Sequence, residues 1–131
     1  MKVHILTPQG LVFEGDALRV RVPGSEGGFE VLNNHARLVS LLGIGKLIVK
    51  DPEKNDLVFA VSGGFVEVNE NVVTVMAEDA VSAEKINLEQ NLDEKEKAES
   101  ELETLKTDTA EHRRVTTELK KITNRINIAR N

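Results

Sequence analysis

Short runs of Val, Ile and Leu recur between turn-forming residues over roughly the first eighty positions of the chain. Leu18, Val20 and Val22 alternate with Arg19 and Arg21, which is the pattern of a strand with one buried face and one face in water. Turn signals return about every ten residues and leave no room for helices between the strands. The pattern therefore predicts an antiparallel β-sandwich in this part of the chain.

The pattern becomes helical from Ser82 onward. All nine Gly, all three Pro and all four Phe lie at or before Phe65, and Glu, Lys, Leu and Ala dominate the rest. We therefore expect a β + α chain with two domains, a β-sandwich over residues 1–81 and a helical hairpin over residues 82–131.

Two capping boxes predict where the helices of the tail begin. One box runs from Asn87 to Gln90 and the other from Asp108 to Glu111. Each helix then carries one narrow apolar stripe, the pattern of two helices that pack against each other. The expected stripes are Leu88, Leu92, Ala98, Leu102 and Leu105 on the first helix and Val115, Leu119, Ile122, Ile126 and Ala129 on the second.

The two predicted helices carry opposite charge. Residues 82–111 hold four Lys against ten acidic residues, and residues 112–131 hold six Lys or Arg against Glu118 alone. Exposed ion pairs between such arms contribute only a few tenths of a kcal/mol each. The connection Lys106-Thr107-Asp108 has no Gly or Pro to force a stop. We therefore expect a marginal hairpin that can also straighten into a rod, which is the kind of element a switch needs.

Composition argues against several classes of function. The chain has no Cys, and its three His are far apart with no flanking metal ligands, so we expect no enzyme, no metal and no cofactor. A net charge of −5 and the lack of Trp and Tyr argue against nucleic-acid binding. No apolar stretch is long enough for a signal peptide or a membrane span. A protein partner is the expectation that remains.

Three weaker hypotheses concern individual segments of the sandwich. Glu26 and His35 would form an acid–base pair if the chain were an enzyme. The Gly-rich segments 23–28 and 62–65 suggest phosphate loops but lack the Gly-Lys-Ser/Thr ending, so we expect turns there. A freestanding ligand-binding sandwich with a dimerising helical tail would need an exposed aromatic face, whereas the four Phe occupy strand positions that we expect to be structural.

Five strings of the sandwich follow one another in a characteristic order and spacing. They are Thr7-Pro8-Gln9-Gly10 leading to Phe13-Glu14-Gly15, Val22 to Phe29, Leu32 to Ala36, Ser62 to Val68, and Val73 to Ala77. Together with the charged helical pair that follows them, these strings resemble one family, the epsilon subunit of bacterial and chloroplast F-type ATP synthases. The resemblance spans nearly the whole chain.

The resemblance implies a sandwich of about ten strands that docks on the gamma subunit and on the membrane-embedded c-ring. Such a subunit turns with the rotor, couples ion flow to ATP synthesis, and lies at the cytoplasmic face of the bacterial cell membrane as a peripheral part of the complex. By position, the expected c-ring and gamma interface residues are Ser25, Glu26, Gly27, Gly28, Phe29 and His35.

In many bacterial relatives the helical pair extends along gamma into the catalytic head. There its basic face meets acidic segments of the catalytic alpha and beta subunits and blocks ATP hydrolysis. The resemblance assigns that face to Arg113, Arg114, Lys120, Lys121 and Arg125.

Two segments depart from the family pattern. The usual Gly-Ile-Leu-Pro-Gly-His-Ala-Pro segment is here Glu30 to Arg37 and lacks both prolines, so the family pattern does not predict the shape of this loop. Some relatives bind ATP through an Ile/Leu-Asp-x-x-Arg-Ala string, and here Ile86 is followed by Asn87 and Gln90 in place of the Asp and the Arg. Loss of these charged contacts predicts weak or no ATP binding.

Overall fold

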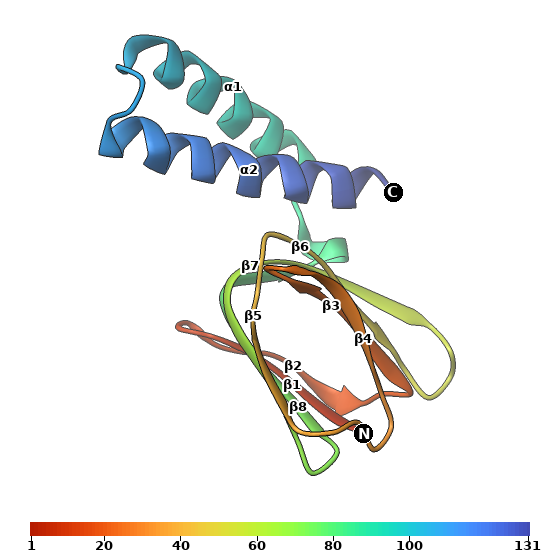
Figure 1. Ribbon diagram of the computed structural model, residues 1–131. Coiled ribbons are helices and arrows are strands. Elements are labelled where there is room, and N and C mark those ends of the chain that lie inside the picture. The colour runs from red at the N-terminus through yellow and green to blue at the C-terminus, as the bar shows by residue number, and fades with distance from the viewer. The chain divides into compact units, whose positions relative to one another are not determined.

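The computed structural model describes all 131 residues and divides them into two compact units, residues 1–83 and 84–131. The first unit ends two residues beyond the expected boundary at residue 81. The reason is that the last strand of the sheet continues to Ser82, which lies opposite Phe59 in the register. Each unit is described by itself below (Figure 1).

The first unit is built from eight strands that form one curled sheet (Figure 1). Seven of them follow the order β2-β1-β8-β7-β6-β3-β4, and β5 pairs with β7. All pairs are antiparallel except β1 with β8, which is parallel. The strands are β1 Lys2–Thr7, β2 Gly10–Asp16, β3 Arg19–Gly24, β4 Gly27–Leu32, β5 Leu38–Leu41, β6 Gly45–Lys50, β7 Asp56–Asn69 and β8 Val72–Ser82.

The sheet becomes a sandwich because β7 and β8 each run through both of its layers. Residues 56–61 of β7 pair with β6, whereas residues 65–68 pair with β5. The strand bends between these parts at Gly63 and Gly64, which have φ values of +69° and +93°. Only glycine adopts such angles freely, and a Cβ on Gly64 would collide with the backbone of β8 at Met76. The sheet thus has eight strands where the family resemblance implied about ten, because β7 and β8 run on through the bend as single long strands.

The core of the sandwich is filled by inward-facing residues, most of them Val, that alternate with outward-facing ones. Valine suits this position because its branched side chain packs well on a pleated surface. Leu18, expected on the buried side, is 45% exposed and precedes β3. The fully buried side chains include Val3, Ile5, Val20, Val31, Leu47, Val49, Val66, Val73 and Val75.

The second unit is an antiparallel pair of helices, α1 Leu88–Thr104 and α2 Ala110–Arg130, after a short 3₁₀ helix at Ala83–Lys85. Asn87 caps α1 as expected, since its Oδ1 accepts a hydrogen bond from the Gln90 backbone N–H at 3.0 Å. The Gln90 side chain, however, donates to Glu94 at 3.3 Å rather than reaching back, so only half of the predicted box forms.

The start of α2 differs by one residue from the prediction. Thr109 is the N-cap, and its Oγ1 accepts from the His112 backbone N–H at 3.1 Å. Asp108 instead takes a left-handed conformation with φ of +67° and reverses the chain between the helices. Asp tolerates this region better than most residues, which explains how a turn without Gly forms here.

The apolar seam between the helices is thin. Its buried members are Ala98, Val115, Ile122 and Ile126. Leu92, predicted in the seam, is 37% exposed, and Asn91 is buried in its place. A step of seven residues back from Ala98 leads to position 91 and not to 92. The prediction chose Leu92 because it is apolar, although the spacing favoured position 91. Leu88, Leu102, Leu105 and Leu119 pack against the buried members.

Candidate interaction surfaces

The segment Ser25–Phe29 forms the tip of the hairpin between β3 and β4. Gly24 pairs with Gly27, which leaves Ser25 and Glu26 as a two-residue turn. Gly27 has φ of +131°, an angle that favours glycine, and nothing lies within 4 Å of the place its Cβ would take. Residues 25–28, which we call the glycine turn, are exposed.

Phe29 does not belong to this exposed tip. It is half-buried and packs against the core of the sandwich. A Cβ added to Gly24 would lie 3.0 Å from the Phe29 ring, so the ring covers that glycine closely. Phe29 supports the turn from inside and presents little surface to a partner.

His35 lies at the other end of β4 from the glycine turn. The six residues of β4 extend for about 20 Å at roughly 3.3 Å per residue, with Gly27 and Gly28 of the turn at one end and His35 three residues beyond the other. The structure therefore does not bring His35 together with residues 25–28, and the hypothetical acid–base pair of Glu26 and His35 is excluded. His35 Nδ1 lies 2.7 Å from the Ala36 carbonyl oxygen, which can only accept, so Nδ1 carries the proton.

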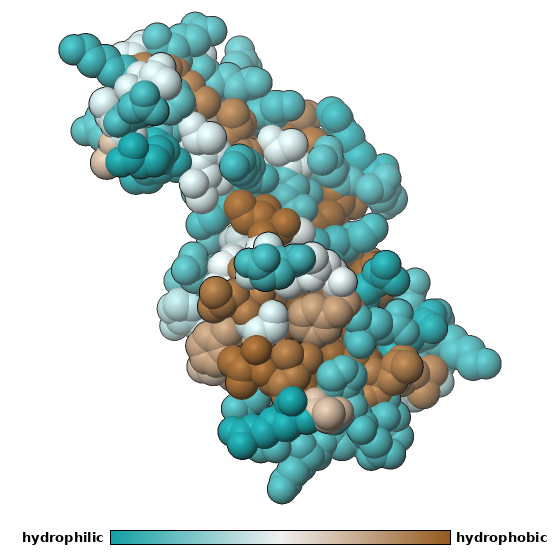
Figure 2. All heavy atoms as spheres, in the orientation of Figure 1, coloured by the Kyte–Doolittle hydropathy of each residue, from teal (hydrophilic) through white to brown (hydrophobic).

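A row of exposed apolar side chains crosses the outer face of one layer. Leu41 lies opposite Phe65, Phe65 opposite Met76, Met76 opposite Leu6, and Leu6 opposite Leu11. Four of these five are large and exposed, from 40% for Phe65 to 66% for Leu41. The row spans five strands, or about 19 Å at roughly 4.8 Å per strand. We call it the apolar row, and Figure 2 shows apolar side chains gathered over β5, where it begins.

The glycine turn and the apolar row meet at one edge of the sandwich. The backbone N–H of Ser25 donates to the Leu41 carbonyl at 2.9 Å, and that of Leu42 donates to the Gly64 carbonyl at 2.9 Å. The polar tip of one hairpin is thus joined directly to the first residues of the row. Sequence reasoning identified the turn and missed the row, and it took Phe65 for a structural residue although the side chain is 40% exposed.

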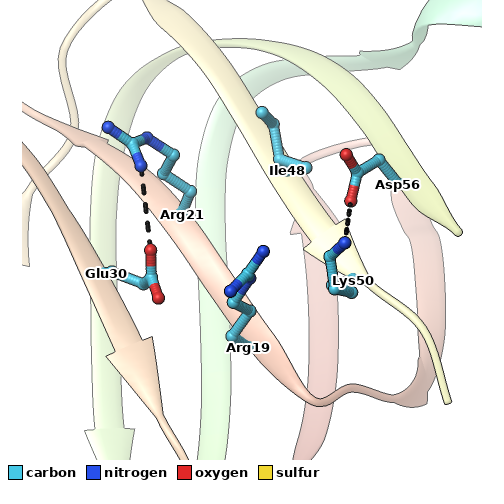
Figure 3. A pocket seen from close by; sticks show the side chains of 6 residues that line it. All are labelled: Arg19, Arg21, Glu30, Ile48, Lys50 and Asp56. Carbon is cyan, nitrogen blue, oxygen red and sulfur yellow. Dashed lines mark ion pairs between the residues drawn. The ribbon is translucent and has the colours of Figure 1, made fainter. Parts of the chain in front are cut away.

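The outer face of the other layer is charged. Arg21 pairs with Glu30 at 3.7 Å and Lys50 with Asp56 at 3.4 Å (Figure 3). Arg19 lies between the two pairs on β3, and the group surrounds a shallow cavity of about 180 Å³. A surface whose charges are largely paired within the sheet is well solvated and needs no partner.

The basic residues assigned to the second helix do not share one environment. Arg113, Arg114 and Lys120 are exposed, and Arg114 lies 3.8 Å from Glu101 of α1. Arg125 differs, because its side chain is only 21% exposed and faces α1. Its Nε donates to Asn91 Oδ1 at 2.7 Å, and its Nη2 lies 3.7 Å from Glu94 Oε2. In the closed hairpin Arg125 is therefore not part of the exposed basic face.

The profile of the family described as "ATP synthase, Delta/Epsilon chain, beta-sandwich domain" matches residues 1–83. The ATP synthase epsilon chain of Halalkalibacterium halodurans is 39% identical over 129 residues, which cover 98% of this chain and 96% of that one. The epsilon chain of Salinibacter ruber is 42% identical over 111 residues, covering 79% and 74%. This chain belongs to the ATP synthase epsilon chain family.

Two solved structures share the fold of this epsilon chain. A chain of the Euglena gracilis mitochondrial ATP synthase matches with a TM-score of 0.79 and 22% identity, covering 93% of this chain and 76% of that one. A chain of the Tetrahymena thermophila mitochondrial ATP synthase central stalk and c-ring matches with a TM-score of 0.62 and 16% identity, covering 98% and 96%. Membership of the epsilon family replaces the hypothesis of a freestanding ligand-binding sandwich. No helix of the structure is both long and apolar enough to cross a membrane.

The loop in which this epsilon chain departs from the family pattern is held by asparagines. Asn34 has φ of +62°, and the His35 N–H donates to the Leu32 carbonyl at 3.1 Å, which closes a tight turn. The Asn34 N–H donates to Asn71 Oδ1, and Asn71 Nδ2 donates to Asn33 Oδ1, both at 2.8 Å. Asn tolerates a positive φ better than most residues, so the loop forms a tight turn without proline.

The altered ATP string lies at the start of α1. Asn87 is the N-cap, and Gln90 donates to Glu94. Ile86 is half-buried just before the cap. The side chains at the two altered positions are thus neutral and engaged within α1 itself, so neither supplies a charge for a phosphate group.

Proposed function

We propose that this epsilon chain works as a rotor subunit that couples ion translocation through the c-ring to ATP synthesis in the catalytic head. The observation that carries the proposal is the continuous surface formed by the glycine turn and the apolar row. A contiguous set of exposed apolar side chains on a folded domain marks a protein-binding face. The subunit itself catalyses no step and acts through this contact.

The two parts of the surface suit two neighbours in the rotor. The apolar row docks on the gamma subunit, because burying Leu41, Phe65 and Met76 gains hydrophobic free energy that the isolated chain leaves unused. The glycine turn faces the polar loops of the c-ring, where exposed backbone without Cβ atoms at 27 and 28 allows close approach. His35, beyond the far end of β4, is not part of the glycine turn.

The helical hairpin supplies a brake on ATP hydrolysis. Its seam has four buried apolar residues, and an exposed ion pair such as Arg114 with Glu101 contributes little in water. The arms can therefore separate at low cost and extend along gamma into the head. There the basic face of Arg113, Arg114, Lys120 and Lys121 meets acidic segments of the catalytic alpha and beta subunits and stops rotation. Association with the cytoplasmic face of the bacterial membrane is peripheral and runs through the complex.

A reconstitution experiment tests both roles. The full chain and a truncation after Lys85 are added to an epsilon-depleted catalytic head that retains gamma. The cut is placed there because β8 runs to Ser82 and the 3₁₀ helix to Lys85. We expect both forms to bind gamma and only the full chain to lower the ATPase rate. Failure of both forms to bind would overturn the docking role, and equal ATPase rates would overturn the brake.

A further inference from the structure

The mouth of the helical hairpin holds a buried polar contact that the apolar seam does not explain. We propose that Asn91 and Arg125 form a latch that keeps the two helices together, and that breaking it shifts the hairpin toward its open form. The effect of that shift on ATP hydrolysis rests on the brake proposed above, whereas the latch itself is a property of the hairpin.

Both polar atoms of the Asn91 side-chain amide form hydrogen bonds. Its side chain is among the few buried polar groups of the chain, with 8% of the residue exposed. Oδ1 accepts from Arg125 Nε at 2.7 Å, and Nδ2 donates to the Asn87 carbonyl at 2.8 Å. No buried side-chain nitrogen or oxygen lacks a hydrogen-bond partner. The amide therefore links the cap of α1 to the guanidinium of α2.

Arg125 is held by a second group as well. Its Nη2 lies 3.7 Å from Glu94, and Glu94 in turn accepts from Gln90 at 3.3 Å. The Arg125–Glu94 pair is more protected than the Arg114–Glu101 pair, because the Arg125 side chain is 21% exposed and the Arg114 side chain 69%. Hydrogen bonds to charged groups are stronger than neutral ones, and protection from water reduces their screening.

The position of the contact makes it a latch rather than one more seam residue. Asn91 is the fourth residue of α1 and Arg125 the sixth from the end of α2. The pair thus lies at the mouth of the hairpin, far from the turn at Asp108. Helices that separate at the mouth of the hairpin must break this contact early, while the turn can act as the hinge.

Because of the latch, neutralising Arg125 is expected to change inhibition in the opposite direction from neutralising an exposed basic residue. Neutralising a residue of the basic face weakens its attraction to the catalytic subunits. Neutralising Arg125 instead releases the hairpin, which raises the population able to reach those subunits. Asn91 provides an independent check, because its substitution breaks the same contact without changing any charge.

The opening is measured on the full chain by the distance between two spin labels. Lys97 and Lys120 are exposed on α1 and α2, and the chain has no Cys of its own, so Cys at these two positions takes both labels. Closed helices hold the two axes about 8–10 Å apart, whereas a straight helix of 23 residues places the sites about 35 Å apart. Arg125→Gln and Asn91→Ala are compared with Arg130→Gln, which removes the same charge from an exposed site of the same helix.

We expect Arg125→Gln and Asn91→Ala each to raise the ratio of long to short distances about tenfold, the effect of losing one charge-assisted hydrogen bond. Arg130→Gln leaves the ratio unchanged. The double variant shifts it no further than Arg125→Gln alone, because the Asn91 contact is already lost when Arg125 is replaced. An unchanged ratio, or shifts that simply add as for a general loss of helix, would overturn the latch.

ATPase rates of the reconstituted head, measured with the unlabelled variants, separate the latch from the brake. When the latch and the brake both operate, the Asn91→Ala variant inhibits ATP hydrolysis more strongly than the unsubstituted chain. A tenfold shift in distances without a change in ATPase rate would support the latch and remove the proposed brake.

Discussion

Leu41 and Met76 allow a direct test of the docking surface, because both are exposed in the free chain. Leu41 is 66% exposed and Met76 44% exposed, and they lie on β5 and β8, the two strands that flank Phe65 of β7 in the apolar row. Replacing them by Ser removes most of the apolar area that a partner would cover. The matched control is Leu32→Ser, since Leu32 is 53% exposed but is not part of the row.

The expected loss of affinity follows from these exposed fractions. Full burial of such a side chain is worth about 2 kcal/mol, so covering the exposed part contributes about 1.3 kcal/mol for Leu41 and about 0.9 kcal/mol for Met76. Leu41→Ser is therefore expected to weaken binding to gamma about tenfold, and the double variant about fortyfold. Leu32→Ser should leave the dissociation constant unchanged.

Titration of each variant into an epsilon-depleted head that retains gamma measures these constants. Urea unfolding of the free variants checks that the sandwich is intact, because exposed substitutions usually change the free energy of unfolding by less than about 0.5 kcal/mol. If the double variant binds as tightly as the unsubstituted chain, the apolar row is not the docking face. If Leu32→Ser weakens binding to the same extent, the contact lies elsewhere on the sandwich.

Three further predictions concern the bend, the nucleotide and the charges. Gly64→Ala should lower the free energy of unfolding in urea by at least about 3 kcal/mol, because the added Cβ would collide with the Met76 backbone and φ is +93°. The control Gly28→Ala should be neutral, because the nearest atom to its added Cβ is the Val22 carbonyl oxygen at 3.5 Å. Equal effects of the two substitutions would contradict the reasoning. Isothermal titration of the full chain with ATP should show no micromolar binding, since Asn87 and Gln90 are neutral, and a micromolar constant would refute this. Charge reversal of the basic face should weaken inhibition as high salt does, and unchanged inhibition would assign the block to the apolar seam. The set is the exposed Arg113, Arg114 and Lys120 together with the half-buried Lys121.

Local patterns in the sequence were enough to define the elements of this protein. Alternation of period two and regular turn signals predicted the β-sandwich, and the change in composition predicted where helices take over. The cap at Asn87 was correct and that at Asp108 was one residue early. Such features depend on contacts within a few residues, so the sequence displays them directly.

The sequence also placed the glycine turn but not the surface around it. The apolar row joins residues 6, 11, 41, 65 and 76, which are neighbours only through the register of five strands. Alternation says which residues of one strand share a face, but it does not say which residue of another strand lies opposite. It therefore could not reveal that exposed apolar residues from distant segments line up.

Tertiary structure likewise decided the roles of Asn91, Arg125 and His35. The family resemblance put Arg125 on the basic face, and its approach to α1 became visible only in the packed hairpin. The family resemblance grouped His35 with the glycine turn, whereas the strand β4, about 20 Å long, separates His35 from Ser25 and Glu26. Residue type and local spacing thus determined the elements and the family, while long-range pairing decided which side chains meet and which face water.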